Sequence, residues 1–163
     1  MEPTKYSRKY EELQRAYLRI KRLYDGKIIN QVQDGDWECS FQSPKDIVKN
    51  FFRVCYELKE SLRFDPGSPP HLSANDWVFV EQFCKTDFYV SLSMDIANQE
   101  KHIVLKRPKT SKKIWEINTN IHIFSPNNRT ELTIEIDEKK EDCLILAWNI
   151  LAGWNKFWSD NNL

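Results

Sequence analysis

Apolar residues recur at intervals of three and four along most of the chain, which is the spacing of helices that bury one face. The pattern predicts helices near residues 6–24, 44–62, 77–84 and 88–102, and a last helix that begins around Glu138. Ser43 and Pro44 have the residue types of an N-cap and a first helical position. Along the last helix a broad apolar face, which includes Trp148 and Trp154, is expected to close the bundle.

The period changes from helical to alternating within residues 113–136, as expected for two strands with one buried face. A turn at 125–128 separates the strands, so we expect an antiparallel hairpin. Residues 103–105 are a candidate third strand. The expected inward-facing residues of the hairpin are Ile117, Ile121, Leu132 and Ile134.

The predicted fold class is therefore α+β and mainly α. We expect a bundle of about five helices, with a β-hairpin or a three-stranded sheet inserted before the C-terminal helix. Residues 1–163 are expected to form a single domain with a β insertion at 103–136, because this length suits one domain with a substantial core.

Composition excludes several classes of function. Lys and Arg together number 24, as do Asp and Glu, so the formal net charge of +0 gives no global field to attract a polyanion or a membrane. Only four Gly are present, which argues against Gly-rich phosphate loops. The four Cys form no CxxC pair, and Cys55, Cys84 and Cys143 are expected to be small buried residues. Without an apolar leader or membrane span, we expect a cytoplasmic protein with no membrane contact.

The helix at 88–102 carries an unusual polar stripe. At 100° per residue, Ser91, Asp95, Asn98 and His102 fall within about a 60° arc, and most of the remaining circumference is apolar. Ser, Asp, Asn and His are mediocre helix formers, whereas an ordinary wet face carries Glu, Lys, Gln and Arg. The stripe, together with Lys101, is therefore a candidate functional site.

Three interpretations of this stripe remain open. In the first interpretation, the residues form a buried polar cluster that satisfies its own hydrogen bonds. Alternatively, His102 is a general acid or base oriented by Asp95, while Asn98 and Lys101 hold a phosphate. In the third interpretation these groups and Ser91 bind a nucleotide or a partner without chemistry. No metal or cofactor is expected, because the stripe lacks a third strong metal ligand.

Three segments carry a resemblance to a known group of proteins: FFRVCYELKESL, LSMDIANQEKH and EDCLILAWNILAGW. They resemble blocks of short, mostly uncharacterised bacterial proteins with an Asp-x-Ala-Asn-x-x-Lys-His motif, here Asp95 to His102. That group is similar to the HEPN superfamily. The resemblance implies a helical bundle among relatives that include ribonuclease toxins, antiviral effectors and inactive nucleotide- or partner-binding proteins.

HEPN ribonucleases place an Arg four to six residues before the His, whereas positions 96–98 of this chain hold Ile, Ala and Asn. We therefore expect a HEPN-like component of a stress or phage-defence system, such as a toxin–antitoxin pair, that binds a partner or a nucleotide. Its partner could be another protein or a second copy of the chain. The alternative is a metal-independent endoribonuclease that binds RNA and uses His102.

Overall fold

The computed structural model describes residues 3–25, 43–65, 77–99, 114–121 and 130–163 of the 163-residue chain. The helices and strands of this part, in chain order, are α1 (Lys5–Tyr24), α2 (Pro44–Phe64), α3 (Trp77–Thr86), α4 (Phe88–Gln99), β1 (Ile114–Ile121), β2 (Thr130–Ile136), β3 (Lys139–Asp142) and α5 (Cys143–Asp160). Five helices with antiparallel strands before the C-terminal helix confirm the predicted fold class, mainly α with some β.

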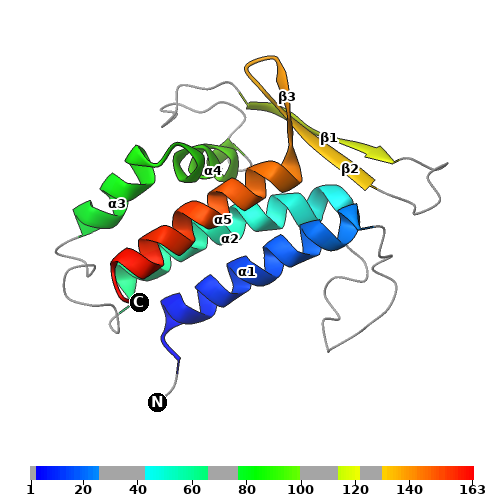
Figure 1. The fold of residues 1–163 in the computed structure, drawn as a ribbon. Coiled ribbons are helices and arrows are strands. Elements are labelled where there is room, and N and C mark those ends of the chain that lie inside the picture. Colours follow the sequence, from blue (N-terminus) through cyan, green and yellow to red (C-terminus); the bar gives the residue numbers. More distant parts are fainter. Residues whose placement is uncertain (1–2, 26–42, 66–76, 100–113, 122–129) are drawn as a thin grey trace.

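Four long helices form the body of the molecule. In Figure 1, α5 runs across the front between α4 above and α1 below, and α2 lies behind it. Neighbouring helices pack in the order α1, α2, α4, α5 and back to α1, while α3 packs on α2 and α4. The largest fully buried side chains are Trp154, Phe51, Phe52, Leu13, Ile20, Ile47, Leu58, Leu62, Met94, Ile96 and Leu132. The core is therefore the shared interior of this bundle together with the inner face of the sheet.

The helix starts follow their local sequence. The Ser43 hydroxyl accepts a hydrogen bond from the Asp46 N–H at 3.2 Å, and Pro44 occupies the first turn of α2, as predicted. The side chain of Asp87 accepts from the Val90 N–H at 2.9 Å and thereby caps α4. These caps satisfy backbone donors that a helix start otherwise leaves unpaired.

The three strands form one antiparallel sheet in the order β1-β2-β3 at one end of the bundle (Figure 1). In β2, Ile134 pairs with Ile117 of β1 and with Glu141 of β3. Leu132 and Ile134 are fully buried, which confirms their predicted inward orientation. The side chains of β1 lie outside the described part of the structure, so the inward orientation of Ile117 and Ile121 stays a prediction.

Tyr24, the last residue of α1, connects the bundle to the sheet. Its hydroxyl oxygen lies 2.7 Å from the Leu132 carbonyl oxygen and accepts a hydrogen bond from the Leu132 N–H at 3.1 Å. Asp142 Oδ2 is 3.1 Å away. Pairing between β2 and β3 ends at Thr133 and Asp142, so Tyr24 supplies the partner for the next backbone groups of β2. Burial raises the pKa of this hydroxyl, which therefore stays protonated.

The predicted start of the last helix at Glu138 is wrong. Asp137 and Glu138 form a two-residue turn with φ angles of 49° and 65°, and the next four residues form β3. Positive φ at both positions is the geometry that suits a tight hairpin, where Asn-Gly or Asp-Gly is the usual sequence. The Asp142 side chain then accepts a hydrogen bond from the Ile145 N–H at 2.9 Å, and α5 begins at Cys143.

Some predictions fall on parts of the chain that the structure does not describe. These are the third strand at 103–105, the turn at 125–128 and the continuation of α4 beyond Gln99. Among the described helices, none is both long enough and apolar enough to cross a bilayer.

Candidate functional site

The predicted polar stripe begins inside the bundle. Ser91 is 2% exposed and Asp95 is 1% exposed, while Asn98, one turn further along α4, is half-buried. Lys101 and His102 lie outside the described residues. The structure therefore places Ser91 and Asp95 in the interior, and the predicted grouping of His102 with Asp95 stays a prediction.

Burial of α4 follows from its position against α2, α3 and α5. Phe88 and Tyr89 in its first turn are exposed, residues 90–97 are all buried, and Asn98 is half-buried. Ser93 donates a hydrogen bond to the Val90 carbonyl at 2.7 Å, which satisfies that hydroxyl locally. Ser91 Oγ is buried and has no hydrogen-bond partner within the described ranges, a state that costs free energy.

Neither a metal-binding cluster nor an exposed cysteine is present among the described residues. Within the described ranges, no three His, Cys, Asp or Glu residues stand close enough to hold a metal ion. The predicted burial of Cys55, Cys84 and Cys143 is confirmed, and none of these three is in a disulfide. Burial raises the pKa of the Cys143 thiol to about 12, so it is protonated near neutral pH and a poor nucleophile.

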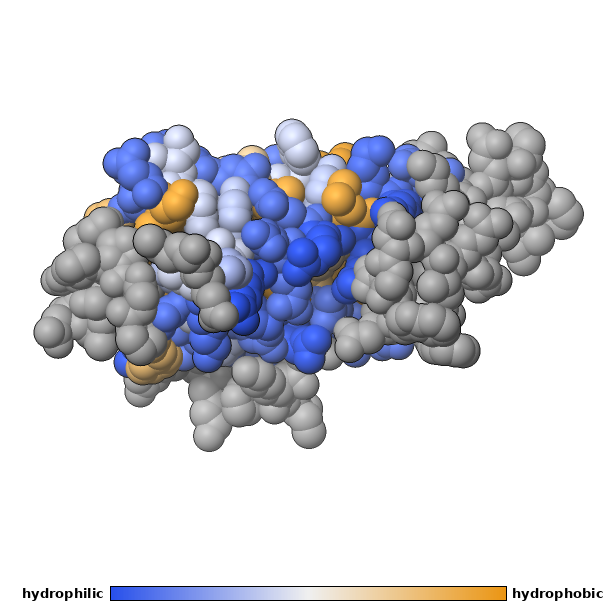
Figure 2. Space-filling model, turned by 90° about the horizontal axis from the view of Figure 1, so that it is seen from below, coloured by the Kyte–Doolittle hydropathy of each residue, from blue (hydrophilic) through white to orange (hydrophobic). Residues whose placement is uncertain are grey.

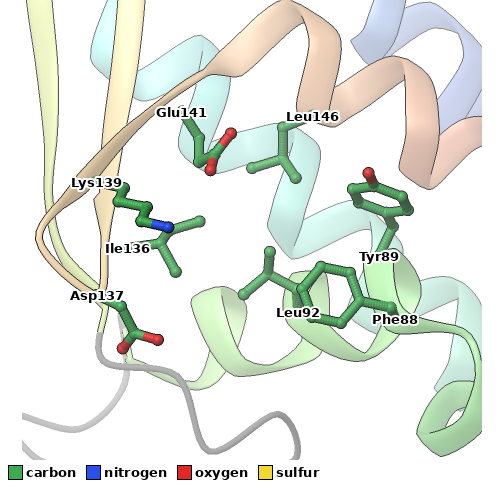
Figure 3. A pocket seen from close by; sticks show the side chains of 8 residues that line it. All are labelled: Phe88, Tyr89, Leu92, Ile136, Asp137, Lys139, Glu141 and Leu146. Atoms are coloured by element: carbon green, nitrogen blue, oxygen red, sulfur yellow. The ribbon is translucent and has the colours of Figure 1, made fainter.

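A cleft of about 290 Å³ opens where the first turn of α4 meets the β2–β3 hairpin and the start of α5 (Figure 3). Helix α4 supplies Phe88, Tyr89 and Leu92, and α5 supplies Leu146. The hairpin contributes Ile136, Asp137, Lys139 and Glu141. The capping Asp87 and the tight turn at Asp137 thus position the two walls of this cleft.

The chemistry of the cleft is apolar inside and charged on the hairpin side. Figure 3 shows the ring of Phe88 beside Leu92, whereas the side chains of Lys139 and Glu141 come from the opposite wall. The Phe88 and Tyr89 rings meet edge to face, with centroids 5.3 Å apart. Two carboxylates accompany a single ammonium group. A site of this kind suits an apolar or aromatic group better than a phosphate, which the carboxylates would repel.

A second exposed apolar surface lies on α5. Ile145 is 63% exposed and Trp148 is 55% exposed, so the prediction that Trp148 helps to close the bundle is wrong. The Trp148 ring contacts α1, where its centroid lies 5.8 Å from that of Tyr17. Trp154, six residues further along, is fully buried as predicted.

Sequence analysis missed both the cleft and this surface for identifiable reasons. The cleft depends on the β2–β3 turn, whose Asp-Glu sequence gives no turn signal. The α5 surface arises because residues 143–154 of this helix are apolar on nearly all sides, so that periodicity alone does not show which side is buried.

The chain was compared with models of known protein families, with curated proteins and with solved structures. None of them matches. The function is therefore argued from the geometry of the chain itself.

Proposed function

We propose that this protein is a HEPN-like, cytoplasmic component of a bacterial stress or phage-defence system, for example a toxin–antitoxin pair, and that it works by binding a protein partner. The three segments that resemble the HEPN-like group support the first half of this proposal. Their described residues lie on α2, on α4 and across the start of α5, and α4 packs against both of the others. Segments far apart in sequence thus belong to one packed unit.

The cleft between α4 and the β2–β3 hairpin is the observation that supports binding of a protein partner. Its floor of Leu92, Ile136 and Leu146 is apolar, and half of the Phe88 side chain is exposed at its edge. Exposed aromatic residues beside a small apolar depression are typical of protein interfaces, where one apolar side chain of the partner fills the depression. A partner segment that presents a Leu, Met or Phe next to a Lys or Arg would match the apolar floor and the carboxylates of Asp137 and Glu141.

A nucleotide is the less suitable occupant. Nucleotide sites normally supply several backbone N–H groups or cationic side chains to the phosphates. The lining of this cleft supplies Lys139, together with the carboxylates of Asp137 and Glu141. A base could stack on Phe88, but its phosphates would then lie near two negative charges.

The test compares two phenylalanines of nearly equal exposure. Phe88, at 51%, borders the cleft, whereas Phe79 on α3, at 50%, lies outside it. Tagged wild-type, Phe88→Ala and Phe79→Ala proteins serve as bait in cells that produce the protein. Proteins retained by the wild type are identified by mass spectrometry, purified and titrated by calorimetry.

The proposal expects Phe88→Ala to weaken the reconstituted complex on the order of 30-fold, as loss of a central aromatic contact does. Phe79→Ala should bind as the wild type does. Equal binding by the two variants would show that the cleft does not bind the partner. If the purified wild type binds ATP or GTP and the Phe88→Ala variant does not, the ligand of the cleft is a nucleotide and not a protein.

A further inference from the structure

Strand β3 forms one edge of the sheet. It pairs with β2, and no other strand of the described part pairs with it. Its first three residues are exposed, and the fourth, Asp142, is half-buried. An edge strand of this kind presents backbone N–H and C=O groups that a further extended segment can pair with.

The tight turn determines which backbone groups of β3 face outward. Ile136 pairs with Lys139 across a turn of two residues, so these two residues exchange hydrogen bonds with each other. Hydrogen-bonded and non-hydrogen-bonded pairs alternate along an antiparallel ladder. Lys140, opposite Glu135, therefore directs its N–H and its C=O away from β2. Among the described residues, no backbone hydrogen bond outside the strand pairing involves these two groups.

The cleft adjoins the same strand. Residues that pair across neighbouring strands project to one face, so Lys139 and Glu141 share the face of Ile136 and Ile134. Lys139, Glu141 and Ile136 also line the cleft (Figure 3). A strand beside β3 would alternate its side chains in the same way, so every second side chain would lie on the side of the cleft. The free edge and the cleft thus form one continuous surface.

We infer that the protein partner binds as an extended segment that adds a strand to the sheet beside β3. This inference rests on the proposed function, since it specifies how the partner occupies the same cleft. The N–H and C=O of Lys140 bond to the backbone of the segment, and one apolar side chain of the segment lies on the floor at Leu92 and Ile136. A Lys or Arg two positions away in the segment lies on the same face, where the Glu141 carboxylate attracts it.

The edge and the cleft have complementary roles in this arrangement. Strand β3 has only four residues and all of them are charged, two features that limit indiscriminate pairing with other strands. Backbone hydrogen bonds do not distinguish one sequence from another, so the apolar residue in the cleft supplies the specificity. A helical segment suits this surface less well, because its backbone groups are already paired internally and cannot bond to Lys140.

The first experiment removes the outward N–H of Lys140. The partner retained by the wild type is titrated by calorimetry against Lys140→Pro and Lys140→Ala. Lys140→Pro should weaken binding roughly tenfold, because Pro has no N–H, whereas Lys140→Ala keeps the N–H and should bind within about threefold of the wild type. Pro is tolerated on an edge strand where the N–H faces away from the neighbouring strand, so both variants should melt as the wild type does. Equal binding by Lys140→Pro and Lys140→Ala would overturn the inference.

The second experiment leaves the protein unchanged. Synthetic peptides of the partner's binding segment carry a single N-methyl group at successive positions. Alternate positions should lose affinity, because every second N–H of an added strand faces β3. A uniform or absent effect would overturn strand addition, even if Phe88→Ala still weakens binding and the cleft therefore remains the site of the partner. Binding that Phe88→Ala and Lys140→Pro both leave unchanged would overturn the proposed function as well.

Discussion

Replacing Trp154 by Ala would test the organisation of the core. The Trp154 side chain is fully buried on α5, with its ring edge to face against Phe83 of α3 at 5.2 Å and against Phe157 at 6.0 Å. The substitution removes the largest buried side chain of the bundle and leaves a cavity between α5 and α3. Because α5 also packs on α1 and α4, and α3 also packs on α2 and α4, we expect little collapse around the cavity.

The expected loss follows from the packing and from one polar atom. Truncation of a buried Trp or Phe to Ala usually costs about 3–5 kcal/mol. The indole N–H of Trp154 has no hydrogen-bond partner in the described structure, so the wild type already carries the cost of an unsatisfied donor. We therefore expect Trp154→Ala to lower the free energy of unfolding by about 3 kcal/mol, at the lower end of that range. Trp154→Phe retains the ring contacts and removes the donor, so its cost should stay below about 1.5 kcal/mol.

Urea denaturation followed by circular dichroism gives the free energy of unfolding, and a thermal melt gives an independent measure. For a chain of this size, about 3 kcal/mol corresponds to a fall in Tm of roughly 6–12 °C. Trp148→Ala is the matched control, because the half-exposed Trp148 should cost about 1 kcal/mol or less. Equal losses for Trp154→Ala and Trp148→Ala would refute the distinction between the buried and outward faces of α5. A loss in Trp154→Phe as large as in Trp154→Ala would refute the role given to the indole N–H.

Two further predictions concern the junction of bundle and sheet and the untested part of the polar stripe. Tyr24→Phe should lower the free energy of unfolding by about 1–3 kcal/mol, because it leaves the buried backbone groups of Leu132 unpaired. Hydrogen exchange at the Leu132 amide should become faster for the same reason. An unchanged exchange rate would mean that Tyr24 does not stabilise β2. Purified wild-type protein should leave RNA intact in the presence of a chelator, since the chain has no net positive charge and no Arg at the nuclease spacing. Cleavage by the wild type, with a His102→Ala variant that is inactive but melts at the same temperature, would establish the endoribonuclease alternative.

Local sequence was sufficient to predict the elements whose own residues determine them. Helix α1 ends at Tyr24 as expected, and the Ser43 cap marks the start of α2. The alternation in β2 also identified its buried positions, Leu132 and Ile134. In each case the period of the apolar residues and the terminal residues favour the same structure.

The start of α5 could not be predicted in this way, because residues 138–142 are all charged and have no apolar period. Acidic residues suit the first turn of a helix, so Glu138, Glu141 and Asp142 favour a start near Glu138. Pairing with β2 instead extends the sheet through Asp142, which then caps the helix. Tertiary hydrogen bonding thus outweighed a local electrostatic preference.

For the candidate site, the sequence predicted which helix is unusual but not what surrounds it. Ser91 and Asp95 do share the interior face of α4, yet the adjoining exposed cleft is built from a turn that lies more than 40 residues further along the chain. A pattern within one helix contains no information about a wall that another segment supplies.

The contact between the first and last helices has a consequence for how the chain folds during synthesis. The Tyr10 hydroxyl donates a hydrogen bond to Asn155 across 145 residues of sequence, and its ring stacks on Trp158 at 3.9 Å. Ribosomes add about 5–20 residues per second, so one side of α1 stays uncovered for on the order of ten seconds until α5 has been synthesised. Its aromatic stripe is available to chaperones, and to other unfinished chains, throughout that interval. Closure of the bundle is therefore a late step on the ribosome, dominated by contacts of high sequence separation.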